Sequence, residues 1–263
     1  MLHVSLLSLA KITMPKYLFA LLILTTTACA QKKPVDERAS QIVNQCIEVH
    51  GGENYNDMDV SFNFRKFRIH LKQKAGIFLY ERTTRDSLNN EIHDMLTNDS
   101  FTREINGSKE KLTQKDFDKY KEALNSVAYF ALLPYKLKEP AANLKYLGET
   151  IIDNKKYDKI AVSFNETGGG KDYKDVFCYW IARAEHTMDY MAYSNGGPRF
   201  RKAIKREKVD AVIFQDYENY EIADTTIAVF NYDNSFKEGK VKLLSTIEQS
   251  SYSSGKTSKQ KQP

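Results

Sequence analysis

Hydrophobic and polar residues alternate along most of the chain, which is the pattern of β-strands that bury one face. In the stretch DVSFNFRKFRIHL, residues 59–71, the alternation shifts by one position between Phe64 and Phe67. We interpret this shift as a β-bulge or as a strand that changes its covered face. The same alternation predicts further strands over residues 77–85, 91–96, 100–105, 144–152, 157–164, 175–183, 187–193, 199–204, 209–220 and 241–247.

Two segments instead repeat apolar residues at the spacing of an amphipathic helix. The first covers residues 36–50, and the Gly51-Gly52 pair directly after it is a helix C-cap signal. The second covers residues 115–130, with Thr113 placed to cap its first turn and Pro134 placed to stop it. Because the connections between strands are short, we expect antiparallel hairpins and a single α+β domain over residues 36–249.

Three consecutive glycines, Gly168 to Gly170, lie in the stretch NETGGGKDYKDVFCYW. A phosphate-binding loop needs a glycine, four further residues and then Gly-Lys-Ser/Thr leading into a helix. Here Lys171 is followed by Asp172, and the next predicted element is a strand. We therefore predict a hairpin loop and no phosphate site.

The two ends of the chain differ from this pattern. Residues 1–28 have lysines ahead of an apolar run too short to span a membrane, which is typical of a signal peptide. The small residues before Cys29 resemble a bacterial lipobox, although Thr26 stands where leucine is usual, and Met14 is an alternative start. We expect a lipid on Cys29 and a lipidated linker over residues 29–35. Residues 250–263, polar and lysine-containing, are predicted to be a disordered basic tail.

Charge and cysteine content exclude several classes of protein. The formal net charge is only +5, and the basic excess falls mainly in the tail, so no nucleic-acid partner is expected. Besides Cys29, the chain has Cys46 and Cys178, which either form one disulfide or remain as buried thiols. Isolated cysteines and scattered histidines lack the paired spacing of a zinc site, so we expect neither a metal nor a cofactor.

Polar residues that could carry chemistry are densest on the hairpins of the second half of the chain. Paired carboxylates can act as acid and base where their surroundings separate their pKa values. The same residue types also form cross-strand pairs for structural reasons, and we favour that interpretation. No nucleophile elbow and no His-Glu-x-x-His helix occurs, so no catalytic residue is predicted. The candidate polar cluster consists of Asp172, Asp175, Asp189, Tyr190, Arg199, Arg201, Asp216 and Tyr217.

Aromatic residues are abundant, with 14 Phe and 16 Tyr. The stretch VAYFALLPY, residues 127–135, is more apolar than the end of a surface helix needs. Such residues either fill a core beneath the sheet or line a cavity for acyl chains, and both interpretations remain open. The candidate cavity residues are Tyr129, Phe130, Leu132, Leu133, Tyr135 and Trp180.

Five stretches together resemble an uncharacterised family of exported Bacteroidota lipoproteins: CIEVHGGENYNDMDVSFNFRKFRI, SVAYFALLPYKL, GGGKDYKDVFCYWI, MDYMAYSNGGPRFR and FQDYENY. That family is of unknown function and implies no catalytic residue. In outline the pattern is similar to the LolA/LppX-like half-barrel, in which a large curved antiparallel sheet wraps apolar helices around a lipid-accepting cavity. The resemblance implies an N-terminal helix and a helical insertion packed on the concave face. Because the residues after Cys29 are not acidic, it also implies an outer-membrane lipoprotein that faces the periplasm.

We therefore expect a lipid-anchored, non-enzymatic protein that binds or carries an apolar ligand, either a lipid or an acylated protein. The first alternative is an exported enzyme that uses the Asp/Arg/Tyr cluster on a polar substrate. The second is a structural lipoprotein that docks a protein partner. An apolar pocket favours the binding protein, whereas a polar pocket around Asp189, Arg199 and Asp216 favours the enzyme.

Overall fold

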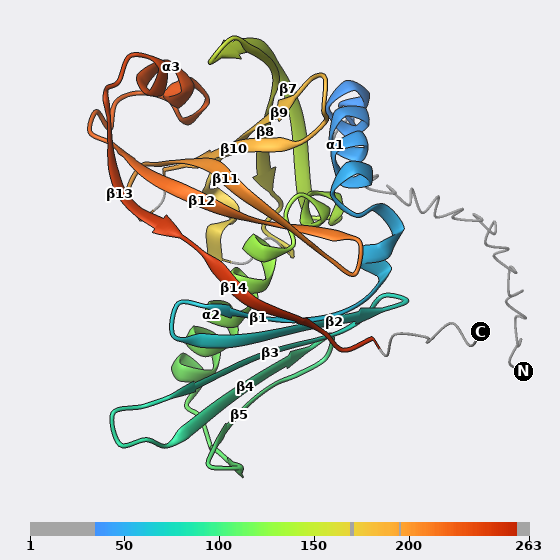
Figure 1. Ribbon diagram of the computed structural model, residues 1–263. Helices are drawn as coiled ribbons and strands as arrows, with labels where there is room; N and C mark the ends of the chain where they lie inside the picture. Colours follow the sequence, from blue (N-terminus) through green and yellow to red (C-terminus); the bar gives the residue numbers. More distant parts are fainter. Residues whose placement is uncertain (1–34, 169–170, 195, 257–263) are drawn as a thin grey trace, which may run out of the picture. The chain divides into compact units, whose positions relative to one another are not determined.

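The computed structural model describes residues 35–168, 171–194 and 196–256, in which strands predominate (Figure 1). The predicted signal peptide and Cys29 lie outside the described residues. Two antiparallel sheets of seven strands each make up the structure, which confirms the predicted α+β class. Division into two sheets accords with the strong twist of antiparallel strands, because open sheets rarely exceed ~10 strands without splitting.

Sheet A has the spatial order β14-β1-β2-β3-β4-β5-β6, and sheet B has the order β13-β12-β11-β10-β9-β8-β7. The strands β13 and β14 are separated only by Glu248, so one stretch of chain passes from sheet B into sheet A. The bounds in sheet A are β14 Gln249–Ser254, β1 Asp57–Phe64, β2 Phe67–Lys74, β3 Ile77–Arg85, β4 Glu91–Thr97, β5 Phe101–Ile105 and β6 Ser108–Lys109. Those in sheet B are β13 Val241–Ile247, β12 Val212–Ile222, β11 Arg199–Val209, β10 Met188–Tyr193, β9 Phe177–Ala182, β8 Lys155–Phe164 and β7 Ala142–Ile152.

Both predicted helices form, with the caps that the sequence indicated. Helix α1, Glu37–His50, ends at Gly51, whose φ of 156° and close approach to Tyr55 leave no room for a Cβ. Helix α2, Gln114–Ala131, begins after Thr113, whose hydroxyl accepts a hydrogen bond from the Asp116 amide. A short third helix, α3 Tyr232–Lys237, was not predicted, because six residues are too few for a clear helical period. Four short 3₁₀ helices complete the described elements: η1 Gly52–Asn56, η2 Tyr135–Lys138, η3 Lys171–Lys174 and η4 Val229–Asn231.

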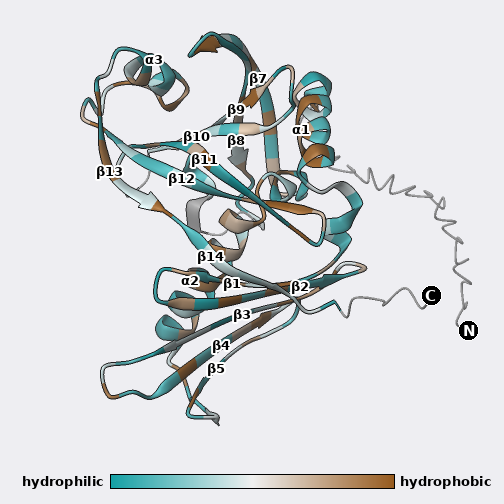
Figure 2. Ribbon diagram, in the orientation of Figure 1, coloured by the Kyte–Doolittle hydropathy of each residue, from teal (hydrophilic) through white to brown (hydrophobic). Residues whose placement is uncertain are grey.

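Two hydrophobic clusters occupy opposite faces of sheet B. Along β9, Tyr179 and Ile181 join the larger cluster, to which α1, α2 and sheet A also contribute. The alternate residues Cys178 and Trp180 join a smaller cluster that includes Tyr232, the first residue of α3. Hydrophobic and hydrophilic residues are interleaved along the strands in Figure 2, as this two-sided arrangement requires.

The alternation shift in the first strands comes from a turn, so the bulge interpretation is wrong. β1 and β2 form an antiparallel hairpin in which Phe64 lies opposite Phe67 and Phe62 opposite Ile69. Phe64 and Phe67 are opposite each other across the two-residue turn and therefore lie on the same face of the sheet. Since they are three positions apart in the sequence, the apolar alternation is displaced by one position. Arg65 adopts a φ of 56° in this turn, a conformation that glycine or asparagine usually signals. Without either residue, the turn could not be recognised in the sequence.

The end of the domain also differs from the prediction, because residues 250–254 belong to a strand and are not part of a disordered tail. β14 pairs with β1, and the Tyr252 ring lies 5.6 Å from Phe62 and 5.5 Å from Phe214. Tyr252 is the single large apolar residue in a serine-rich stretch, so the alternation was too weak to predict a strand. Residues 257–263 lie outside the described residues.

Candidate functional site

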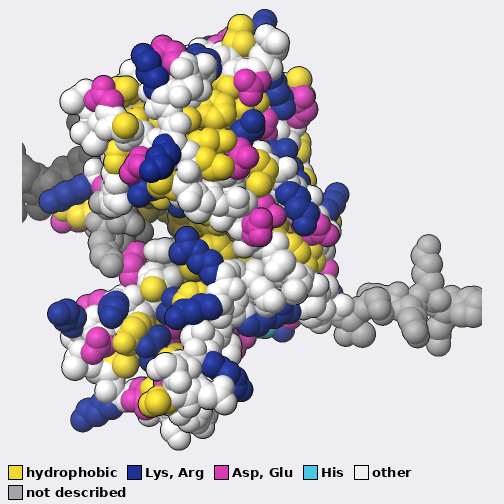
Figure 3. All heavy atoms as spheres, turned by 60° about the vertical axis from the view of Figure 1, so that its left-hand side comes forward, with side chains coloured by type: hydrophobic (Ala, Val, Ile, Leu, Met, Phe, Trp, Pro, Cys, Tyr) yellow, Lys and Arg dark blue, Asp and Glu magenta, His cyan; other side chains and the backbone are white. Residues whose placement is uncertain are grey.

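A cavity of about 380 Å³ lies between the C-terminal half of α2 and residues of both sheets. Its walls come from the β1–β2 turn, the C-terminal half of α2, and strands β8 to β11 and β13. Figure 3 brings the left-hand side of Figure 1 forward and shows a recess between the upper and lower parts of this face, with hydrophobic side chains in it. The residues that line the cavity are Phe64, Arg65, Glu122, Asn125, Ser126, Val127, Tyr129, Phe130, Leu133, Glu139, Phe164, Gly168, Asp175, Phe177, Tyr179, Met191, Tyr193, Arg201 and Ile247.

Aromatic rings in mutual contact form much of the wall. Phe164 lies 6.0 Å from Tyr129 and 5.7 Å from Phe177, and the Phe177 ring lies 6.0 Å from Tyr193. On the helix side of the wall, Glu122, Ser126 and Tyr129 or Phe130 recur about once per turn of α2, so they lie on one face of the helix. The first two ring pairs are edge to face and the third is tilted, and these contacts hold each ring against its neighbours in an apolar surface.

Three of the six candidate cavity residues line this cavity: Tyr129, Phe130 and Leu133. Leu132 lies in the core instead, and Tyr135 stacks on Tyr55 with ring centroids 4.6 Å apart. Trp180 belongs to the other face of sheet B, where its ring lies 5.2 Å from Phe200. The alternation along β9 explains this placement, because Phe177 and Tyr179 already occupy the cavity side.

The loop that contains the three glycines joins two antiparallel strands, as predicted. β8 and β9 are paired, with Tyr157 opposite Ala182 and Val162 opposite Phe177. Gly168 has a φ of 87° and lines the cavity, and a Cβ there would lie 3.3 Å from the Ala141 Cβ. Gly169 and Gly170 lie outside the described residues.

The candidate polar cluster does not converge on one site among the described residues. Arg201 and Asp175 line the cavity, whereas Tyr190 packs in the smaller cluster and Tyr217 in the larger one. Asp216 accepts a hydrogen bond from the Gln249 amide at 2.8 Å, and burial raises the pKa of this carboxyl. Arg199 donates to the Pro198 carbonyl at 2.8 Å and lies 3.9 Å from Glu221. The side chain of Asp172 lies outside the described part of the chain.

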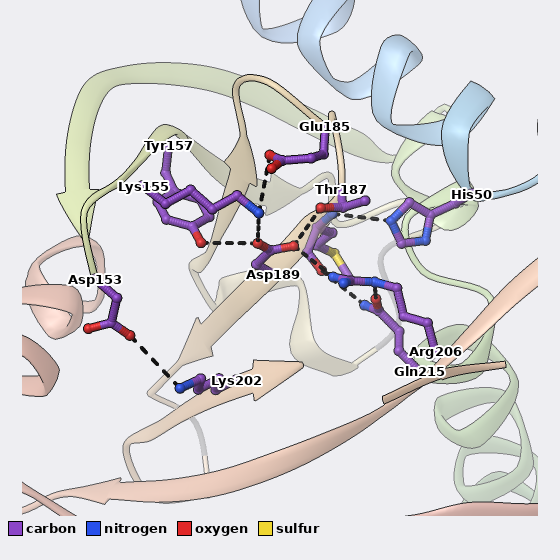
Figure 4. Close-up of polar contacts among 11 residues, drawn as sticks. His50, Asp153, Lys155, Tyr157, Glu185, Thr187, Asp189, Lys202, Arg206 and Gln215 are labelled. Atoms are coloured by element: carbon purple, nitrogen blue, oxygen red, sulfur yellow. Dashed lines mark hydrogen bonds and ion pairs between the residues drawn. The ribbon is translucent and has the colours of Figure 1, made fainter. Parts of the chain in front are cut away.

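Asp189 is the best-connected member of that set (Figure 4). It is the extra residue of a β-bulge, because Met188 pairs with Ile181 while Tyr190 pairs with Trp180. Its Oδ2 lies 2.9 Å from Lys155 Nζ and 3.0 Å from the Tyr157 hydroxyl. Its Oδ1 accepts from Thr187 Oγ1 at 2.6 Å and from Arg206 Nη2 at 2.7 Å.

These partners fix the charge state of Asp189. Burial alone would raise the pKa of the carboxyl, but the hydrogen bonds from Thr187 and Lys155 and the charge of Arg206 hold it below its ordinary value. Nearby, burial lowers the pKa of His50 to about 4, so its Nε2 is free to accept the Met188 amide at 3.1 Å. A carboxylate with four donors has no lone pair aimed at a substrate, so the geometry is that of a structural hub.

Cys46 and Cys178 are both buried free thiols, which decides between the two alternatives left open by the sequence. Burial raises the pKa of each thiol, so both remain protonated at neutral pH. Over the described residues, no group of histidine, cysteine and carboxylate side chains has the geometry to hold a metal ion.

Histidine and carboxylate side chains alternate across the face of sheet A that points away from the core. His70 Nε2 lies 2.8 Å from Asp59 Oδ1, and His70 Nδ1 lies 2.5 Å from Glu81 Oε2. Glu81 Oε1 in turn lies 2.9 Å from His93 Nε2. This ladder ties β1, β2, β3 and β4 together through charges that depend on pH.

The ladder predicts a fall in stability as pH rises. The hydrogen bond to Glu81 raises the pKa of His70 against the effect of burial, and Asp59 acts in the same direction. Because the pKa of His70 is higher in the folded protein than in the unfolded chain, where it is 6.5, its protonation stabilises the fold fully below pH 6.5. This stabilisation is lost as pH rises through the pKa of His70 in the folded protein. The loss should be ~1 kcal/mol or less, because the side chains are partly exposed. The lowered pKa of His50 changes stability in the opposite direction, so the test is the difference in urea midpoint between the wild type and His70→Gln. This difference should shrink as pH rises above 6.5, and a constant difference would refute the assignment.

Comparison with protein families gives one match, over residues 16–249, to the Family of unknown function (DUF6503). No curated protein matches the chain. Among solved structures, a LolA superfamily protein from Nitrosomonas europaea is similar at 8% identity and a TM-score of 0.45, covering 81% of this chain and 92% of that one. The lipoprotein LppX of Mycobacterium tuberculosis is similar at 11% identity and a TM-score of 0.30, covering 61% of this chain and 90% of that one.

None of the helices in the described residues is long and apolar enough to cross a membrane.

Proposed function

We propose that the protein, which belongs to the DUF6503 family of unknown function, is a non-enzymatic binding protein. Its ligand would occupy the cavity beside α2. The observation that carries this proposal is the cavity itself. Its volume of about 380 Å³ falls in the range of roughly 300–1,000 Å³ that is usual for small-molecule sites. Its walls are mainly aromatic and aliphatic, so an apolar ligand is the class that they suit.

Burial of apolar surface supplies the driving force. Each Å² of ligand and wall removed from water contributes roughly 25 cal/mol, so an acyl chain enclosed by Phe64, Phe130 and Met191 gains several kcal/mol. The wall side chains also belong to the main core or pack on it, so they are held in place before a ligand arrives. A site formed in advance avoids much of the ordering cost of binding.

No observation favours catalysis by the polar cluster. Asp189, Arg199 and Asp216 each have separate partners in the described structure, and the Asp189 carboxylate is saturated with donors. The lining also includes polar side chains from α2, from β11 and from the β1–β2 turn, which can orient one end of a ligand.

Titration of the purified protein with a fluorescent fatty-acyl probe tests the proposal. We expect saturable binding of one probe per chain and displacement of the probe by an unlabelled long-chain amphiphile. Absence of saturable binding would contradict the proposed function. Probe binding that the unlabelled amphiphile cannot displace would also contradict it, because the probe would then be adsorbed to the protein surface and not bound in the cavity.

We further propose that Cys29 carries a lipid that anchors the protein to a membrane facing the periplasm. The support is the run of small residues that ends at this cysteine, which follows a short apolar segment. Several acyl chains on one residue hold a protein firmly at a bilayer, whereas a single chain does not.

The Cys29→Ser variant should consequently move from the membrane fraction to the soluble fraction. Cys46→Ser is the matched control, because this cysteine is buried in the domain and carries no anchor. Fractionation followed by immunodetection measures both variants. If Cys29→Ser stays with the membrane, the lipid anchor is not at this residue.

A further inference from the structure

Arg201 brings a positive charge to the wall of the apolar cavity. Its guanidinium lies 4.8 Å from the Phe130 ring centroid and 5.0 Å from that of Tyr193. It donates to the Tyr193 hydroxyl at 2.7 Å, and its Nε lies 3.4 Å from Asn219 Oδ1. These contacts hold the side chain in place. They use the Nε and Nη2 atoms and leave the other N–H donors of the guanidinium available to a ligand.

The charge of Arg201 has no ionic partner among the described residues. It contacts a hydroxyl, an amide oxygen and two aromatic rings, all of them neutral. Three acidic side chains line the cavity. Glu139 pairs with Lys136 at 2.6 Å, Glu122 accepts a hydrogen bond from Ser126 at 3.5 Å, and Asp175 also has a partner. Arg82 and Arg103 differ from Arg201 in this respect, because both form ion pairs with the carboxylate of Asp94. Arg201 is half-buried, and even partial burial of a charge without a counter-ion costs free energy.

A second guanidinium lines the same cavity. Arg65, in the turn between β1 and β2, is exposed, and no hydrogen bond or ion pair fixes its charged end within the described structure. Burial lowers the pKa of Arg201, and the charge of Arg65 acts in the same direction, as expected for two cations at one site. An arginine remains protonated in proteins despite such effects, so both keep their charge.

From this arrangement we infer that the ligand is an anionic amphiphile, whose carboxylate or phosphate headgroup binds Arg201 and Arg65 while its apolar chain occupies the aromatic part of the cavity. The inference rests on the proposed function, since it concerns the same cavity. Arginine binds both headgroup types through two parallel N–H donors, so the chemistry shared by fatty acids and phospholipids is what the site recognises. The exposed Arg65 meets the headgroup first, and the more buried Arg201 supplies most of the selectivity.

Binding of three ligands with identical chains tests the inference: dodecanoate, dodecyl phosphate and dodecanol, each titrated into the full chain at neutral pH. We expect at least one anion to bind about tenfold or more tightly than dodecanol, the gain typical of a hydrogen bond to a charged group. The anion that binds tighter identifies the headgroup. In Arg201→Gln this preference should fall to about twofold or less, with dodecanol affinity retained, and Arg201→Lys should restore part of it.

Two further variants keep the test decisive if Arg201→Gln folds poorly. Arg65→Gln alters an exposed turn residue and should reduce the preference for anions by a smaller factor. Arg85→Gln is the control, because this exposed arginine on β3 pairs with Glu91 and does not line the cavity. Equal affinity of the wild type for dodecanol and both anions would overturn the inference and leave the proposed function intact. Failure of all three ligands to bind would overturn both.

Discussion

Replacing Asp94 by asparagine should lower the free energy of unfolding by about 3–5 kcal/mol, because it leaves two buried arginines without a counter-charge. Asp94 Oδ2 accepts from Arg82 at 2.6 Å and 3.0 Å, and both carboxylate oxygens accept from Arg103, at 2.6 Å and 2.9 Å. The Asp94 side chain is only 1% exposed, so water cannot take over its role.

This triad also joins sheet A to α2. The Arg103 guanidinium lies 3.2 Å from the ring centroid of Tyr120, which is in the second turn of α2, and later residues of this helix form part of the cavity wall. Loss of Asp94 should therefore loosen the helix as well as the sheet.

Denaturant unfolding measures the Asp94 effect. Glu91→Gln is the matched control on the same strand, because Glu91 and Arg85 are 49% and 56% exposed and such pairs contribute ~0.5 kcal/mol or less. Similar losses for the two variants would contradict the assignment of Asp94 as a buried hub.

Replacing Val127 by tryptophan should weaken ligand binding by roughly 10- to 100-fold. Val127 lies on the cavity side of α2 and is partly buried, so a larger ring there can occupy the space of the ligand without entering the packed core. The estimate follows from the cost of overfilling a packed site, roughly 1–3 kcal/mol, of which each 1.4 kcal/mol is about tenfold in affinity.

Probe titration and denaturant unfolding of the same samples separate blocked binding from lost folding. Lys119→Trp serves as the control, because it adds the same ring to an exposed position of α2 that does not line the cavity. We expect Val127→Trp to retain a cooperative unfolding transition and Lys119→Trp to bind like the wild type. Unchanged affinity in Val127→Trp would place the ligand elsewhere.

Local signals in the sequence predicted the helices and most strands. Thr113 and Asp116 marked the start of α2, and Gly51 marked the end of α1, since both motifs act within one turn of chain. The Arg65-Lys66 turn and β14 were misinterpreted for the opposite reason. Arg65 carries no residue-type signal for its positive φ, and β14 is stabilised by pairing with β1, which lies far away in the sequence.

The candidate cavity was predictable only on its helical side. The apolar stretch at the end of α2 indicated Tyr129, Phe130 and Leu133, but the opposite wall comes from strands of two sheets that converge only in the folded chain. Trp180 was also assigned to the cavity, whereas Phe177 and Tyr179 occupy that side of β9. Arg201 was assigned to a polar cluster by its charge, and only the structure places it among aromatic rings.

Native mass spectrometry tests the central claim, a ligand in the cavity beside α2, most directly. The protein would be measured as purified and again after incubation with a total lipid extract, with Val127→Trp treated in parallel. We predict a one-to-one complex with a small amphiphile in the wild type, removable by solvent, and a strongly reduced complex in Val127→Trp. A wild type that keeps its ligand-free mass throughout, or equal adducts on both proteins, would contradict the account.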